Sequence, residues 1–105
     1  MGPIKGVLKE ELSNSLRMQR DYERELAKLP KGSLVKKIIK GHAYYYLVSR
    51  KDEKVRFVYK GKLSEAELRK YKEIKDGRAR YRKLLAQINR QVLFLRKSLR
   101  GKESV

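Results

Sequence analysis

The last third of this chain carries a long hydrophobic repeat. From Tyr71 to Leu99, apolar residues recur at alternating steps of three and four with one basic interruption at Arg78, which is the heptad spacing of a helix that packs along a seam. Ser64 followed by Glu67 is the capping-box signature of a helix start. We therefore predict a helix over residues 64–100, on the order of 50 Å long at 1.5 Å per residue. The seam consists of Tyr71, Ile74, Arg78, Tyr81, Leu85, Ile88, Val92, Leu95 and Leu99.

A helix of this length constrains the rest of the fold, because the short middle segment of the chain cannot cover it. Its seam must pack against another helix of the same chain or against a copy of itself. Gly77 weakens the middle of the repeat, since glycine costs about 1 kcal/mol relative to alanine inside a helix. A break near residue 77 is therefore left open.

The first segment also has a helical period. We predict a helix over residues 7–29 that ends before Pro30, because proline cannot continue it. The residues that recur on one face are Leu8, Leu12, Ser15 or Leu16, Gln19, Tyr22, Leu26 and Leu29.

The middle segment, residues 33–61, has the β-branched and aromatic clusters that are typical of strands. Lys40-Gly41 and Asp52-Glu53 separate the clusters and are short enough for hairpin turns. With these turns, Val35 lies opposite Tyr46 and Tyr46 lies opposite Tyr59. The sequence thus predicts a single α+β domain over residues 1–105, with a three-stranded antiparallel meander between an N-terminal helix and a long basic C-terminal helix.

Strand alternation divides this sheet into two faces. We expect one face to form the core against a helix; it carries Val35, Ile39, Tyr44, Tyr46, Val48, Val55, Phe57 and Tyr59. The other face mixes bases with aromatic and aliphatic groups; it carries Lys36, Tyr45, Lys54, Arg56 and Lys60 together with Leu34, Ile38, Leu47 and Val58. A bulge in the second hairpin would exchange the faces of the third strand.

Charge is the main indication of function. The chain holds 29 lysines and arginines against 12 acids, which gives a net charge of +17. Residues 1–32 are nearly balanced, whereas residues 33–62 and 63–105 carry the excess, and no acid occurs from Gly77 to Lys102. Such a field attracts polyanions over long range and weakens with salt. Nucleic acid is the favoured partner, ahead of an acidic protein and of a membrane surface.

Other functional classes have little support in the sequence. There is no cysteine, no apolar stretch of transmembrane length, and no signal-peptide segment, so we expect a soluble cytoplasmic protein. We expect no enzyme, no cofactor and no metal site. The only histidine, His42, flanks a hairpin turn, and no nucleophile has a base patterned beside it.

Two sets of residues are candidates for a nucleic-acid site. On the sheet, Tyr45 shares its face with bases, and an aromatic between cations can stack on a base or sugar while the cations meet phosphates. The sheet candidates are Lys36, Tyr45, Arg56 and Lys60. On the long helix, four bases fall outside the seam toward one side, where they can follow a phosphate backbone. They are Arg82, Lys83, Arg90 and Lys97.

Segments 29–37, 40–48 and 54–61 resemble a family of small uncharacterised prokaryotic proteins that pair such a meander with a C-terminal helical stretch. Their lysine-glycine turn, tyrosine-rich strand and basic strand are also similar to the three-stranded arm-type DNA-binding domains of tyrosine recombinases. In those domains the sheet lies in the major groove and a helix packs behind it. That resemblance implies that the four sheet candidates face the groove. The chain departs from the recombinases beyond the sheet, where it has no catalytic domain.

Three functions remain open at this point. The first is non-catalytic binding of nucleic acid, with duplex DNA favoured, through the basic sheet face and the basic helix. The second is a protein-interaction or regulatory subunit, antitoxin-like or accessory, that docks an acidic partner or forms a homodimer through the helical seams. The third is RNA binding, since tyrosine and arginine also stack on unpaired bases.

Overall fold

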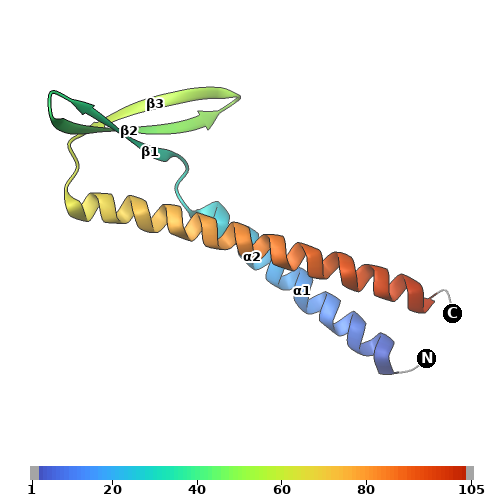
Figure 1. Ribbon diagram of the computed structural model, residues 1–105. Coiled ribbons are helices and arrows are strands. Elements are labelled where there is room, and N and C mark those ends of the chain that lie inside the picture. Colours follow the sequence, from blue (N-terminus) through green and yellow to red (C-terminus); the bar gives the residue numbers. More distant parts are fainter. Residues whose placement is uncertain (1–2, 104–105) are drawn as a thin grey trace. The chain divides into compact units, whose positions relative to one another are not determined.

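The computed structural model describes residues 3–103 and has the predicted α+β fold (Figure 1). Helix α1 (Pro3–Lys28) is followed by strands β1 (Ser33–Ile39), β2 (His42–Lys51) and β3 (Lys54–Gly61) and by helix α2 (Glu65–Glu103). Helix α1 begins earlier than predicted because proline is tolerated in a first turn, where its missing N–H has no intrahelical partner. Helix α2 continues through Gly77 without a break.

The described residues form two compact units. The helical unit contains α1 and residues 78–103 of α2, and the sheet unit is the continuous segment Leu29–Gly77. The helical unit therefore joins segments from the two ends of the chain and pairs the seam of α2 with α1.

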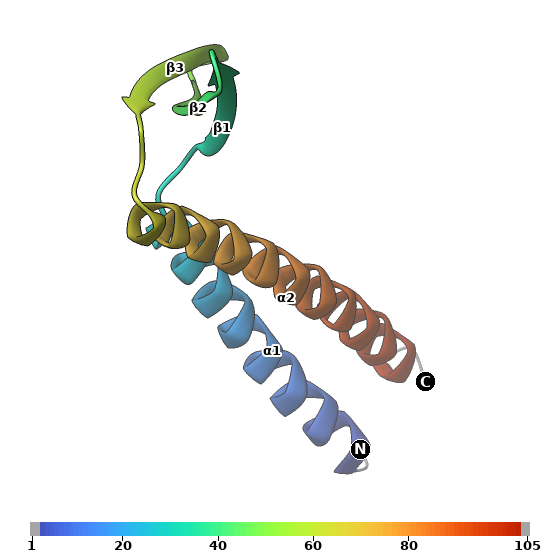
Figure 2. The same cartoon turned by 60° about the vertical axis from the view of Figure 1, so that its left-hand side comes forward.

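Within the helical unit, α1 runs antiparallel to α2, so that the N-terminal end of α1 and the C-terminal end of α2 lie together (Figure 2). Four members of the α2 seam are buried: Ile88, Val92, Leu95 and Leu99. On the α1 side, Ser15 is the buried residue, and Leu12 and Leu16 beside it are half-buried. The seam of residues 78–103 thus has its partner in the same chain.

Specific side-chain pairs fix the alignment of these two helices. The rings of Tyr22 and Tyr81 lie 6.3 Å apart between centroids. Gln91 donates a hydrogen bond of 2.8 Å from its Nε2 to Ser15 Oγ. Because these contacts lie at successive levels of the pair, they define one register for the antiparallel packing.

The sheet has the strand order β1-β2-β3 and is antiparallel throughout. The predicted register is confirmed: Val35 pairs with Tyr46, and Tyr46 pairs with Tyr59. Both hairpins have two-residue turns whose central residues take positive φ, at Lys40-Gly41 and at Asp52-Glu53. Turns with positive φ at both central positions match the right-handed twist of the strands, which explains the tight connections.

The start of α2 has the expected capping box. The backbone N–H of Glu67 donates to Ser64 Oγ at 3.2 Å, and Ser64 Oγ lies 3.1 Å from Glu67 Oε1. The side chains thereby satisfy a backbone donor that has no partner within the helix. Neither helix, over the residues described, has a stretch long and apolar enough to cross a membrane.

Candidate nucleic-acid interface

The register divides the sheet into two faces with different surroundings. The ring face carries Val35, Lys37, Ile39, Tyr44, Tyr46, Val48, Arg50, Val55, Phe57 and Tyr59. The opposite face carries Leu34, Lys36, Ile38, Ala43, Tyr45, Leu47, Ser49, Arg56 and Val58.

The centre of the opposite face is the covered part of the sheet. Leu47 packs closely on the connection from α1: a Cβ on Gly32 would come within 3.1 Å of its side chain. Gly32 also has a φ of +110°, a conformation that other residues rarely adopt. Leu47 lines a hollow together with Tyr71 and Ile74 from the first turns of α2. The sheet unit therefore builds its small apolar centre on this side.

The ring face is open, and the prediction that it forms the core is wrong. Phe57 is 68% exposed and Tyr59 is 58% exposed, and Val35, Ile39 and Val55 are exposed as well. Hydrophobicity favoured this face for burial, but strand alternation does not say which face has a partner. The short connections place Gly32 and the start of α2 against Leu47 instead.

The rings of the open face form one cluster. Tyr46 and Tyr59 are direct cross-strand partners whose ring centroids lie 5.2 Å apart, with the planes tilted by 57°. Tyr44 lies 6.5 Å from Tyr59 by the same measure. These three rings and Ile39 line a shallow hollow. Tyr59 is thus held between two neighbours while more than half of its surface faces solvent.

Cations lie along the ring face. Lys37 pairs with Tyr44 across the β1–β2 ladder, and Arg50 pairs with Val55 across the β2–β3 ladder, so both lie on the ring face, and both are exposed. The Lys62 ammonium lies 5.9 Å from the centroid of the Tyr44 ring, within the range of a cation–π contact. The three strands contain no acidic residue. The ring face is therefore an aromatic surface whose strands carry cations and no acid, while Asp52 and Glu53 lie in the hairpin turn beyond Arg50 and Val55.

The sheet candidates from the sequence lie on the other side. Lys36 and Tyr45 are cross-strand partners, with Lys36 exposed and Tyr45 half-buried. Arg56 pairs with Ser49, four residues from Tyr45 along β2, which is on the order of 14 Å away. The register shifts between Tyr45 and Tyr46, so that Tyr45 faces Gly61 and Lys60 is left without a partner on β2. The structure thus brings Lys36 and Tyr45 together but separates Arg56 from them by the covered centre.

The helix candidates all lie exposed in the helical unit. Lys83, Arg90 and Lys97 are seven residues apart, which places them in one line at intervals of about 10.5 Å. We name this row the basic line. It follows the helix axis on a side of α2 away from the buried seam, and Arg82 precedes its first member, Lys83. The side chains are therefore positioned to follow one extended anionic ligand.

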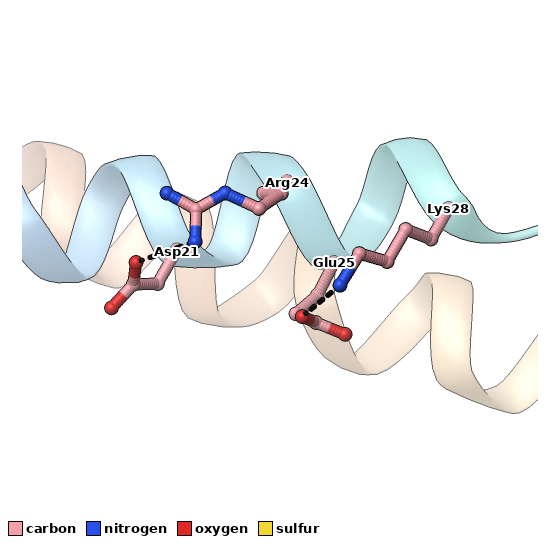
Figure 3. A network of polar contacts seen from close by, with 4 residues as sticks. All are labelled: Asp21, Arg24, Glu25 and Lys28. Atoms are coloured by element: carbon pink, nitrogen blue, oxygen red, sulfur yellow. Dashed lines mark hydrogen bonds and ion pairs between the residues drawn. The ribbon is translucent and has the colours of Figure 1, made fainter.

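By contrast, α1 neutralises part of its own charge. Arg24 lies 3.5 Å from Asp21, and Lys28 lies 3.1 Å from Glu25, each measured between nitrogen and oxygen (Figure 3). Both pairs are exposed, and the two residues of each pair lie one helical turn apart. The residues from Gly77 to Lys102 have no acid in sequence to do the same.

Sequence reasoning assigned the ring face to the core and did not single out Leu93 and Phe94, which are 58% and 66% exposed on α2. A signal for the ring face was present. The register that was predicted correctly already placed Lys37 opposite Tyr44 and Arg50 opposite Val55. Lysine and arginine are almost never fully buried without a partner, so two such residues on one face argue against a core role.

Among residues 3–103, no three histidine, cysteine, aspartate or glutamate side chains come together in a group that could hold a metal ion. His42, beside the first hairpin turn, is exposed.

Residues 8–70 match the model of a family described as a domain of unknown function, DUF6788. The chain belongs to the DUF6788 family. No curated protein and no solved structure matches it.

The DUF6788 match includes most of α1, the whole sheet and the first turn of α2. Both faces of the sheet therefore lie inside the family domain, together with Lys62. The basic line and Arg82 lie beyond its end.

Proposed function

We propose that this protein is a non-catalytic nucleic-acid-binding protein that contacts phosphates through the basic line of α2. The observation that carries the proposal is the exposed, regularly spaced row of Lys83, Arg90 and Lys97 in a stretch without acids. Cations that neutralise phosphates release condensed counterions, and this release supplies most of the sequence-independent affinity for nucleic acid.

Duplex DNA is the form that we propose for this phosphate-contacting surface. A straight helix with cations in one line suits a regular, extended array of phosphates. Lys36, Tyr45, Arg56 and Lys60 are proposed as the contacts of the sheet, as the similarity to arm-type DNA-binding domains implies. RNA is the alternative ligand of the same chemistry.

The test is binding of the nuclease-treated full-length protein to matched duplex DNA, single-stranded DNA and hairpin RNA, measured by fluorescence anisotropy across a salt series. Four to six phosphate contacts predict a log–log salt slope of roughly −4 to −5 on duplex DNA. Replacing Lys83, Arg90 and Lys97 together by glutamine removes three contacts and is expected to make the slope shallower by about 2 to 3 units.

A matched control removes the same amount of charge from α1, through Arg20→Gln, Arg24→Gln and Lys28→Gln. Two of these cations lie beside acids of their own helix, so we expect the slope to remain that of the unchanged protein. Equal losses in both triple variants would show that net charge alone attracts the ligand. Weak binding of the unchanged protein to all three nucleic acids, lost by physiological salt, would reject the proposal.

A second candidate function is docking of an acidic protein partner by the same helix, as expected of a regulatory or accessory subunit. Leu93 and Phe94 favour it, because they expose apolar surface between Arg90 and Lys97. An apolar centre with a charged rim is typical of protein interfaces. This candidate predicts that the protein does not bind nucleic acid and that Phe94→Ala lowers its affinity for the acidic protein partner.

A further inference from the structure

The ring face has an unusually large exposed aromatic and apolar surface. Phe57 and Tyr59 are each more than half exposed, and Val35, Ile39 and Val55 extend the apolar area around them. A contiguous exposed apolar patch on a small protein usually marks a binding surface. A ligand of this face must fit both the rings and the side chains next to them.

The rings are arranged as separate platforms. Phe57 and Tyr59 are two residues apart on β3, so their side chains stand about 6.8 Å apart on the same face. Tyr59 is supported from the side by Tyr46, at 5.2 Å, and by Tyr44, at 6.5 Å, between ring centroids. Support by neighbouring rings limits the rotamers of Tyr59 that binding would otherwise have to freeze, so the Tyr59 platform is formed before a ligand arrives.

The charges around the rings point to an anionic ligand. Lys37 and Arg50 lie on the ring face itself, and Lys62 lies over the Tyr44 ring. No acid occurs on any of the three strands. A second copy of the chain on this face would bring these cations against their own equivalents, because a two-fold contact pairs the same patch with itself.

We propose that the ring face binds unpaired bases of a nucleic-acid strand, with Phe57 and Tyr59 stacking on bases and Lys37, Arg50 and Lys62 contacting phosphates. The proposal rests on the proposed function and adds a second site with its own ligand form. Each nucleotide of an unpaired strand has an accessible flat base next to a phosphate. In a duplex the faces of the bases are stacked on one another and are not accessible. Stacking of bases on aromatic side chains is how proteins commonly hold single strands.

The decisive variant is Phe57→Ala, tested on oligothymidine and oligouridine of about 12 nucleotides, within the size range of single-strand sites. Loss of one stacking platform is expected to weaken binding by roughly 5- to 150-fold. The salt slope should stay the same, because no phosphate contact is removed. Affinity for duplex DNA should also stay the same, since the basic line is intact.

The control is Ile38→Ala, which truncates a residue that is 66% exposed on the opposite face of the same sheet. It is expected to leave single-strand affinity unchanged. Phe57→Leu keeps an apolar side chain without the ring and should behave like Phe57→Ala. This variant also guards against a folding defect, which circular dichroism would reveal.

Several results would overturn the proposal. One is unchanged single-strand affinity in Phe57→Ala, and another is an equal loss on duplex and single strand. A third is a change from dimer to monomer by light scattering with affinity intact, which would assign the face to contact between copies. None of these results affects the salt slope on duplex DNA of the variant with Lys83, Arg90 and Lys97 changed to glutamine. The two proposals can therefore fail separately. Tighter binding of oligouridine or of oligothymidine would support the site and identify RNA or DNA as the source of the strand.

Discussion

Ser15 is the buried residue of α1 at its contact with α2. Its side chain is 1% exposed, and its hydroxyl oxygen accepts a hydrogen bond from Gln91. The hydrogen bond satisfies the buried hydroxyl, and a larger side chain at this level would have to displace its neighbours. The sequence left Ser15 and Leu16 as alternatives for this seam position, because periodicity alone does not favour a polar residue for burial.

We expect Ser15→Leu to lower the free energy of unfolding by about 1 to 3 kcal/mol, the usual cost of forcing extra methylenes into a packed interface. Chemical denaturation followed by circular dichroism measures it. Ser13→Leu, at an exposed position two residues away, is the matched control and should change stability by less than about 0.5 kcal/mol. Similar stabilities for the two variants would contradict the burial of Ser15 between the helices.

At the scale of elements, the start of α2 depends on one cap. Ser64 and Glu67 satisfy each other's polar groups at the point where the chain leaves the sheet. Ser64→Ala is expected to cost about 1 kcal/mol, within a range of 0.5 to 2 kcal/mol for such caps. Thermal unfolding would measure the loss, and Ser64→Asp, which retains a capping oxygen, should recover most of it. A loss that aspartate does not recover would argue against capping as the cause.

The elements themselves were largely predictable because their signals are local. Pro30 limits α1, and the two-residue turns at Lys40-Gly41 and Asp52-Glu53 determine the pairing of the strands. The covered face of the sheet was not predictable, because it depends on where the connections run. The contact of Gly32 with Leu47 decides it, and neither residue belongs to a periodic pattern that would reveal the contact.

At the scale of the whole molecule, repulsion between like charges outweighs attraction. The net charge is +17, and the ion pairs described on α1 are exposed contacts of adjacent turns that stabilise a protein little. Raising the salt concentration from about 10 to 100 mM shortens the Debye length from about 30 to 10 Å. We expect the melting temperature to rise, by about 4 to 8 °C if screening recovers 1 kcal/mol.

Differential scanning calorimetry in the absence of nucleic acid measures this rise. The variant with Lys83, Arg90 and Lys97 changed to glutamine carries less charge and should show a smaller rise. A melting temperature that falls with salt would mean that attractive pairs dominate.

The candidate site was predictable only in part. The composition indicated a polyanion, and the heptad pattern separated Lys83, Arg90 and Lys97 from the seam. The alternating aromatic residues of the ring face have the pattern of a core strand, and the cations Lys37 and Arg50 on the same face were the sequence signal against burial. The exposure of Phe57 and Tyr59 decides against a core role, and exposure is a property of the fold.

The strand order has one more consequence, for solubility. With only three strands, β1 and β3 are both edges, each with a row of backbone groups open to another chain. Lysines and arginines on both edge strands, among them Lys36, Lys37, Lys54 and Arg56, discourage such pairing by repulsion. We therefore expect the positive charge also to oppose pairing of strand edges between copies of the chain. Modification that neutralises these lysines would remove the repulsion between strand edges of different copies. It would also lower the affinity for any polyanion.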